Sequence, residues 1–297
     1  MAETLFILLT AHFLGDFVLQ TEWVVQRKKQ LKVQLMHAAL VTVVSALMLG
    51  SAHMTLLAIL FLSHLAMDAL KVYLLPNGIY MFLLDQLVHI GVICALAYTF
   101  SSEAQNGFWL TWLSADKARW YLLIVTFLGG FLLCVPVGGV LIGIVISPLL
   151  EQIKEDRIKR RRKQWRNGER QPSEQGQREQ GYNDVVRSGG GAEGGEDHED
   201  YCQQDDHAPE DDVEGLSKGG RYIGWLERSL VMMLLLIGQA SGIGFLFAAK
   251  SILRFGEIKD SHQRKMAEYI IIGTFLSFGW ALITSYLTQQ ALRLWHQ

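Results

Sequence analysis

The chain has 297 residues, half of them hydrophobic, and a formal net charge of −2, which gives no indication of a nucleic-acid partner. Cys94, Cys134 and Cys202 form no CxxC pair and no zinc-finger spacing, so no disulfide framework is predicted. The hydrophobic residues are concentrated in long apolar runs, which are typical of an integral membrane protein.

Seven apolar runs are predicted as membrane helices, because a helix needs about 20 apolar residues to span a bilayer. The second run is short, and the fifth is expected to kink near Pro136 and Gly138–Gly139. The predicted fold is therefore an all-α polytopic transmembrane helical bundle with six to eight membrane segments. The runs are Thr4–Val25, Leu35–Leu49, Met54–Leu75, Ile79–Phe100, Trp120–Leu150, Ile223–Ala249 and Tyr269–Leu292.

A polar stretch follows the fifth run. It begins with the basic block KEDRIKRRRKQWR and continues in Gly, Glu, Asp and Gln with almost no apolar residue, which predicts a disordered linker. Four regions are expected: a four-helix membrane core over 1–100, an interfacial segment with a kinked helix over 101–150, the basic block and acidic linker over 151–220, and a membrane helix pair over 221–297.

Basic residues predict the orientation of the chain. Arg27, Lys28, Lys29 and Lys32 place the first loop in the cytoplasm, and counting passes places the linker there too. The loop after the sixth run carries Lys250, Arg254, Lys259, Arg264 and Lys265, yet the count places it outside. Either mixed charges are tolerated there, or the sixth run does not cross fully.

The first run carries a polar stripe in the motif HFLGDFVLQ. His12, Asp16 and Gln20 are spaced by four residues, so on a helix they share one face. The third run contains SHLAMDALK, with His64 and Asp68 four apart. The fourth contains LLDQLVHI, with Asp85 and His89 in the reverse order.

The fourth run crosses the membrane in the opposite direction to the first and third runs, and it carries Asp before His instead of His before Asp. The two reversals cancel, so the histidines are expected at one depth and the aspartates at another. His12, His64 and His89 are expected to form one layer. Asp16, Asp68 and Asp85 are expected to form another, about 6 Å nearer the cytoplasm. His37, near the start of the second run, is expected to reach the aspartate layer.

Ionisable residues at matching depths normally face a bundle interior or a cavity and pair there. Imidazole and carboxylate are also ligands of divalent metals, so a zinc or manganese site is predicted. Its candidate ligands are His12, Asp16, His37, His64, Asp68, Asp85 and His89. Two alternatives stay open: a proton or cation pathway, and a polar network that only holds the helices together.

Gln20, Gln86 and Lys71 flank this constellation. Gln86 can orient a ligand or substrate. Lys71 suits an anionic headgroup or phosphate, although a lysine anchored at the membrane interface explains it as well. The block Arg160–Lys163 suits anionic lipid headgroups or serves as a topology signal alone.

Signals of a different kind occur near the C-terminus. Arg221, Glu227 and Arg228 lie at a helix start, where interfacial anchoring and salt bridges explain them. Small residues four apart favour close helix packing, within the chain or in a homo-oligomer. These small-residue pairs are Gly139 with Gly143, Gly238 with Gly242, and Ala240 with Gly244.

The motifs HFLGDFVLQ, SHLAMDALK and LLDQLVHI, over residues 12 to 89, resemble the bacterial membrane family called domain of unknown function 3307. The phrases GRYIGWLERSL, AAKSILRF and AEYIIIGTFLS resemble the tail of its longer members. The resemblance implies a multi-pass protein of the bacterial inner membrane and carries no activity with it. The acidic linker over residues 165 to 218 is not covered by the resemblance.

The residues favour a metal-dependent membrane hydrolase acting on a lipid-linked or phosphorylated substrate. Asp16, Asp68 and Asp85 are the candidate catalytic carboxylates, one of them serving as a base beside the metal. A proton- or cation-coupled transporter and a non-catalytic membrane scaffold are the alternatives. The Gly-rich phosphate loop, the nucleophile elbow and HExxH are absent from the sequence.

Overall fold

The computed structural model describes residues 1–74, 78–166, 219–255 and 261–295. These residues contain helices, turns and bends and no strand, which confirms the all-α prediction. The predicted linker lies outside the described residues from 167 to 218. The chain divides into two units, Met1–Leu150 with Lys218–Gln297, and Glu151–Ser217.

The described part of the chain contains six helices long and apolar enough to cross a membrane, so the protein is of the multi-pass type that the apolar runs predict. These candidate spans are Ala2–Leu19, Leu31–Leu49, Met54–Leu74, Ile79–Thr99, Ala115–Arg160 and Ala267–Arg293. Exposed large apolar side chains are numerous on them, as expected where lipid replaces water.

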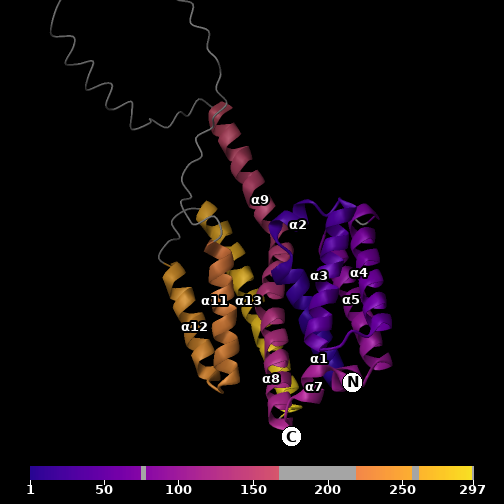
Figure 1. The fold of residues 1–297 in the computed structure, drawn as a ribbon. Coiled ribbons are helices and arrows are strands. Elements are labelled where there is room, and N and C mark those ends of the chain that lie inside the picture. The colour runs from indigo at the N-terminus through magenta and orange to yellow at the C-terminus, as the bar shows by residue number, and fades with distance from the viewer. Residues whose placement is uncertain (75–77, 167–218, 256–260, 296–297) are drawn as a thin grey trace, which may run out of the picture. The chain divides into compact units, whose positions relative to one another are not determined.

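The N-terminal bundle consists of α1 (Ala2–Leu14), α3 (Leu31–Leu49), α4 (Met54–Leu74) and α5 (Ile79–Thr99) (Figure 1). The first predicted helix is shorter than expected. It continues from α1 into one π-helical turn, η1 (Gly15–Leu19), and the short helix α2 (Glu22–Gln26) follows. Gly15 lies against α3, where a β-carbon would come within 2.7 Å of Val41 Cγ2.

Short helices α6 (Glu103–Asn106) and α7 (Phe108–Trp112) lead to α8 (Ala115–Leu132). The expected kink takes the form of a second π-helical turn, η2 (Leu133–Val137), because Pro136 has no N–H to donate. The helix continues as α9 (Gly138–Arg166). Residues of α8 contact α1 on one side and α13 (Ser261–Arg293) on the other.

The sixth predicted helix, Ile223–Ala249, is wrong as a single element. The structure divides it into α11 (Gly219–Leu236) and α12 (Ala240–Phe255), which form a hairpin in Figure 1. Gly238 has φ +77°, and the N–H of Gln239 donates to Leu234 O at 2.8 Å, which is a glycine-terminated helix end. Gly238 therefore makes a turn instead of a packing face, and the C-terminal region has three helices where two were expected.

Close packing of α8 on α13 gives the first prediction. A β-carbon on Gly130 would lie 2.8 Å from Thr288 Cβ, which no side-chain rotation relieves. We expect Gly130→Ala to lower the free energy of unfolding by about 1–3 kcal/mol through overpacking. Thermal unfolding in detergent measures the effect. Gly91→Ala is the control because that position has open space, and an equal loss in both variants would contradict the prediction.

Candidate metal centre

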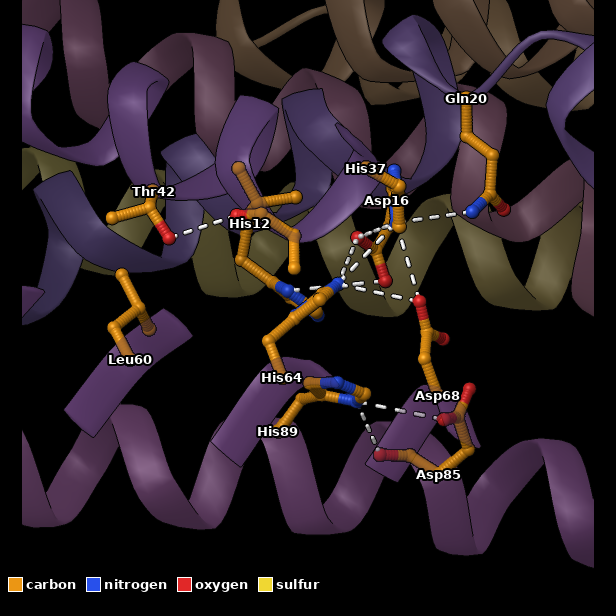
Figure 2. Close-up of polar contacts among 12 residues, drawn as sticks. His12, Asp16, Gln20, His37, Thr42, Leu60, His64, Asp68, Asp85 and His89 are labelled. Carbon is orange, nitrogen blue, oxygen red and sulfur yellow. Dashed lines mark hydrogen bonds and ion pairs between the residues drawn. The ribbon is translucent and has the colours of Figure 1, made fainter. Parts of the chain in front are cut away.

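Seven of the predicted polar side chains gather inside the N-terminal bundle, from α1, η1, α3, α4 and α5 (Figure 2). The three histidines of the predicted layer are in ring contact. His64 and His89 have ring centroids 4.4 Å apart, and His12 lies 5.1 Å from His89 and 5.9 Å from His64. His37 contacts His64 at a centroid distance of 5.2 Å. All four imidazoles are buried.

Four ligand atoms from the two helices α3 and α4 and from η1 lie close together. His37 Nε2 lies 3.3 Å from Asp16 Oδ1 and 3.7 Å from Asp68 Oδ2. His64 Nε2 lies 3.5 Å and 3.8 Å from the same two oxygens. The two Nε2 atoms are 3.3 Å apart. The two imidazole nitrogens thus each lie within 3.8 Å of both carboxylate oxygens.

These distances fit a metal with tetrahedral coordination. Ligand atoms about 2.0–2.1 Å from a zinc ion lie about 3.3 Å from one another at the tetrahedral angle. The five distances above run from 3.3 to 3.8 Å, and His37, His64 and Asp68 form one group of three with ligand spacing. His12 with Asp16 and His64 forms a second, overlapping group of three with ligand spacing.

The carboxylates differ in the cations beside them. Asp68 Oδ1 receives Lys28 Nζ at 3.0 Å, and Asp85 Oδ2 receives Lys71 Nζ at 2.5 Å. Among the ion pairs of the described residues, Asp16 has only imidazole partners. Its side chain is only 9% exposed, so its negative charge is balanced by a proton on a histidine or by a bound cation.

The contacts of His89 determine where its proton lies. Nδ1 is 2.8 Å from the backbone oxygen of Asp85. Because a carbonyl oxygen only accepts, Nδ1 carries the hydrogen and Nε2 keeps its lone pair. Nε2 is buried without a hydrogen-bond partner, as is Asp85 Oδ1. This pair is thus equipped to accept a proton beside the four converging ligand atoms.

Several other buried atoms of the site have no hydrogen-bond partner. Buried polar atoms normally find one, so a group of them marks a place where an ion or water belongs. The unpartnered atoms here are His12 Nε2, Asp16 Oδ1, His37 Nδ1, His64 Nδ1 and Asp68 Oδ2.

Of the flanking residues, Gln20 and Gln86 both reach the site. Gln20 follows the end of η1, and its amide nitrogen lies 3.0 Å from His37 Nε2. An amide nitrogen only donates, so His37 Nε2 accepts here with the lone pair that a metal would use. Gln86 donates to Asp85 Oδ2 at 3.1 Å. Lys71 is an ion-pair partner of Asp85 rather than only an interface anchor.

Sequence reasoning missed Lys28 and Gln34. Lys28 belongs to the basic loop after α2, where a topology signal is sufficient to explain it. Gln34 is buried on α3 and donates to the backbone oxygen of Lys28 at 2.7 Å, which holds the loop where Lys28 meets Asp68. The available signal was its position three residues before His37, on the same helical face.

Residues 4–116 match the family model described as protein of unknown function DUF3307, and the predicted resemblance is confirmed over this part of the chain. The matched residues include every member of the candidate metal centre. The C-terminal phrases of the resemblance lie outside the match and remain a prediction. No curated protein and no solved structure matches the chain.

Proposed function

We propose that this chain is a divalent metal-dependent membrane hydrolase that acts on a lipid-linked or phosphorylated substrate. The proposal depends on one observation: His37 Nε2 and His64 Nε2 each lie 3.3–3.8 Å from both Asp16 Oδ1 and Asp68 Oδ2, and 3.3 Å from each other. Zinc or manganese suits this mixed nitrogen and oxygen set. A divalent metal there supplies a Lewis acid and activates water as a nucleophile.

Asp85 and His89 provide the group that accepts the proton. Neither contributes to the set of four atoms, and His89 Nδ1 lies 3.6 Å from Asp85 Oδ1. A base near a metal site contributes about 10²–10⁴-fold to a hydrolytic rate. Asp16 and Asp68 then act as ligands, the backbone oxygen of Asp85 orients the His89 ring, and the Asp85 carboxylate stabilises the imidazolium that forms when His89 accepts the proton.

Two lysines favour a phosphorylated substrate. Lys28 and Lys71 contact site carboxylates, and their side chains are 15% and 33% exposed. A lysine ammonium is a point charge that binds phosphate oxygens, so these residues can exchange a carboxylate for a substrate phosphate. The neighbouring Arg27, Lys29 and Lys32 add to the positive potential at this end of the bundle.

The basic end of the bundle is the cytoplasmic side in this proposal, in a bacterial inner membrane. The α11–α12 hairpin removes the conflict in the charge pattern. Because the chain turns back at Gly238, Lys250 returns toward the side where α11 starts. Lys250, which pairs with Glu227, then lies toward the end of α11 where Arg221 meets Glu22 of α2, on the same side as Arg27.

A proton or cation pathway is the second candidate. The observation in its favour is the unbroken set of contacts from Lys28 through Asp68, His37 and Asp16 to His12, along the bundle. Proton relays in membranes use such chains of carboxylates and imidazoles. Metal-independent proton uptake into vesicles, sensitive to Asp16→Asn, would favour this candidate over the hydrolase.

The hydrolase is tested by phosphate release from phosphatidic acid and from a polyprenyl diphosphate. We expect release to require re-addition of zinc or manganese after chelation. Asp85→Asn should slow release by about 100-fold or more while the metal stays bound, because the proton acceptor is impaired and the ligands are not. Asp116→Asn, at an exposed position, is the control. Metal-loaded protein that releases phosphate from neither substrate would overturn the hydrolase assignment.

A further inference from the structure

Arg228 is 4% exposed and is the one buried charged residue in the described part of α11. Its Nη1 donates to Ser277 Oγ and its Nη2 to the backbone oxygen of Val135, each at 3.1 Å. Nε has no partner. Two hydrogen bonds to the described residues, for five N–H donors, leave this guanidinium poorly satisfied.

The charge of Arg228 is also unbalanced. Guanidinium stays protonated in proteins, and the ion pairs of the described residues include none between Arg228 and a carboxylate. The adjacent acid, Glu227, is engaged by Lys250 at 2.6 Å. A buried, unpaired cation in a membrane protein is strongly unfavourable and marks a functional position. An anion is the missing partner.

Two glycines allow the backbone to lie close to the guanidinium of Arg228. A β-carbon on Gly139 would lie 3.0 Å from Arg228 Nη2 and 3.3 Å from Trp225 Nε1. Two N–H donors therefore lie beside one point of the backbone, at Gly139, where a side chain would crowd both. A β-carbon on Gly224 would lie 3.1 Å from Nη1. Both glycines are partly exposed, so the point is open to the surroundings of the helices.

We propose that Arg228, Trp225 and the backbone at Gly139 bind a phosphate group, carried on an anionic lipid headgroup or free in solution. Guanidinium and indole N–H are donors that suit phosphate oxygens. Basic pockets between membrane helices recognise lipid headgroups in this way. Arg221, two turns before Arg228 on the same face of α11 and 47% exposed, lies at the outer end of this face. The proposal does not depend on the metal centre.

The variant Gly139→Ala crowds both donors without removing either of them. We expect it to weaken binding by about 10-fold, because one charge-assisted hydrogen bond is displaced. Gly143→Ala, one turn further along α9 and with nothing within 4 Å, should bind as the native chain does. Trp225→Phe keeps an aromatic ring but removes the indole N–H from a residue that is 38% exposed, and should also weaken binding.

Native mass spectrometry of the full chain with phosphatidylglycerol, and thermal unfolding with inorganic phosphate, are the two arms of the test. Lipid retention alone identifies a headgroup site, and stabilisation by phosphate alone identifies a free anion. Either result supports the proposal if Gly139→Ala and Trp225→Phe reduce it and Gly143→Ala does not. The proposal would be overturned if the native chain bound neither phosphatidylglycerol nor phosphate, or if all variants bound them equally.

Discussion

Replacing Asp16 with asparagine is expected to have opposite effects on metal binding and on stability. Asp16 Oδ1 is one of the four converging ligand atoms, so its loss should weaken zinc binding by more than the about 100-fold that outer partners of a ligand contribute. The same carboxylate is a buried charge with only imidazole partners. Removing that charge should leave the metal-free protein as stable as before, or more stable.

Two measurements on Asp16→Asn check this expectation: zinc affinity by competition with a chelator, and thermal unfolding in excess chelator. Asp116→Asn makes the same chemical change at an exposed position of α8 and should alter neither. A metal-free variant that is clearly destabilised, with zinc affinity unchanged, would contradict the metal centre. That result would instead identify Asp16 as part of a polar network that holds the helices together.

Lys28→Met is expected to give the largest loss of stability. Lys28 Nζ is 3.0 Å from Asp68 Oδ1, and the two side chains are 15% and 2% exposed. Removing one partner of a buried ion pair leaves the other charge unpaired, which costs about 3 kcal/mol. Methionine keeps the approximate length of the lysine side chain and its apolar packing. The free energy of unfolding is measured in chelator, because a bound metal would partly balance Asp68.

A double-mutant cycle distinguishes this electrostatic effect from a packing defect. Asp68→Asn added to Lys28→Met removes the stranded charge, so the double variant should regain most of the lost stability. The cycle Lys71→Met with Asp85→Asn is a matched comparison at the more exposed pair and should show a smaller coupling. Additive losses in the first cycle would show that Lys28 and Asp68 act independently.

The sequence predicted the helices that carry the site because apolar length and four-residue spacing are local properties. His64 and Asp68, and Asp85 and His89, lie on regular α-helices, so their shared faces follow from helical geometry alone. The reversed order of the two pairs correctly predicted that His64 and His89 meet. Azimuth around each helix is not a local property, and only the packing of α1, α3, α4 and α5 determines it.

Residue spacing in the sequence could not predict two departures from regular helical geometry. The π-helical turn Gly15–Leu19 changes the faces that follow His12, and Gln20 reaches His37 from beyond the end of the helix. Gly15 permits the close approach of α1 to Val41, yet a glycine in an apolar run does not predict a π turn. The break at Gly238 is a glycine-terminated helix end. From the sequence alone, Gly238 is instead interpreted as one of a pair of small residues in a packing face.

The burial of the charged residue Arg228 also could not be predicted from the local sequence. At the start of an apolar run an arginine is typical of interfacial anchoring, and its burial depends on partners far away in the sequence. Those partners are Val135 in η2 and Ser277 in α13. Lys28 was likewise explained by the positive-inside rule, although its ammonium lies against Asp68. A single sequence does not distinguish such charges from the exposed ones around them.

Elemental analysis of the full chain, purified in detergent without added metal, tests the central claim most directly. The native protein is measured beside the double variant His64→Ala, Asp68→Ala, with folding verified by gel filtration and circular dichroism. We predict close to one zinc or manganese ion for each chain in the native protein and its loss in the folded variant. A native protein that contains no divalent metal and is not stabilised by added zinc or manganese would contradict the account.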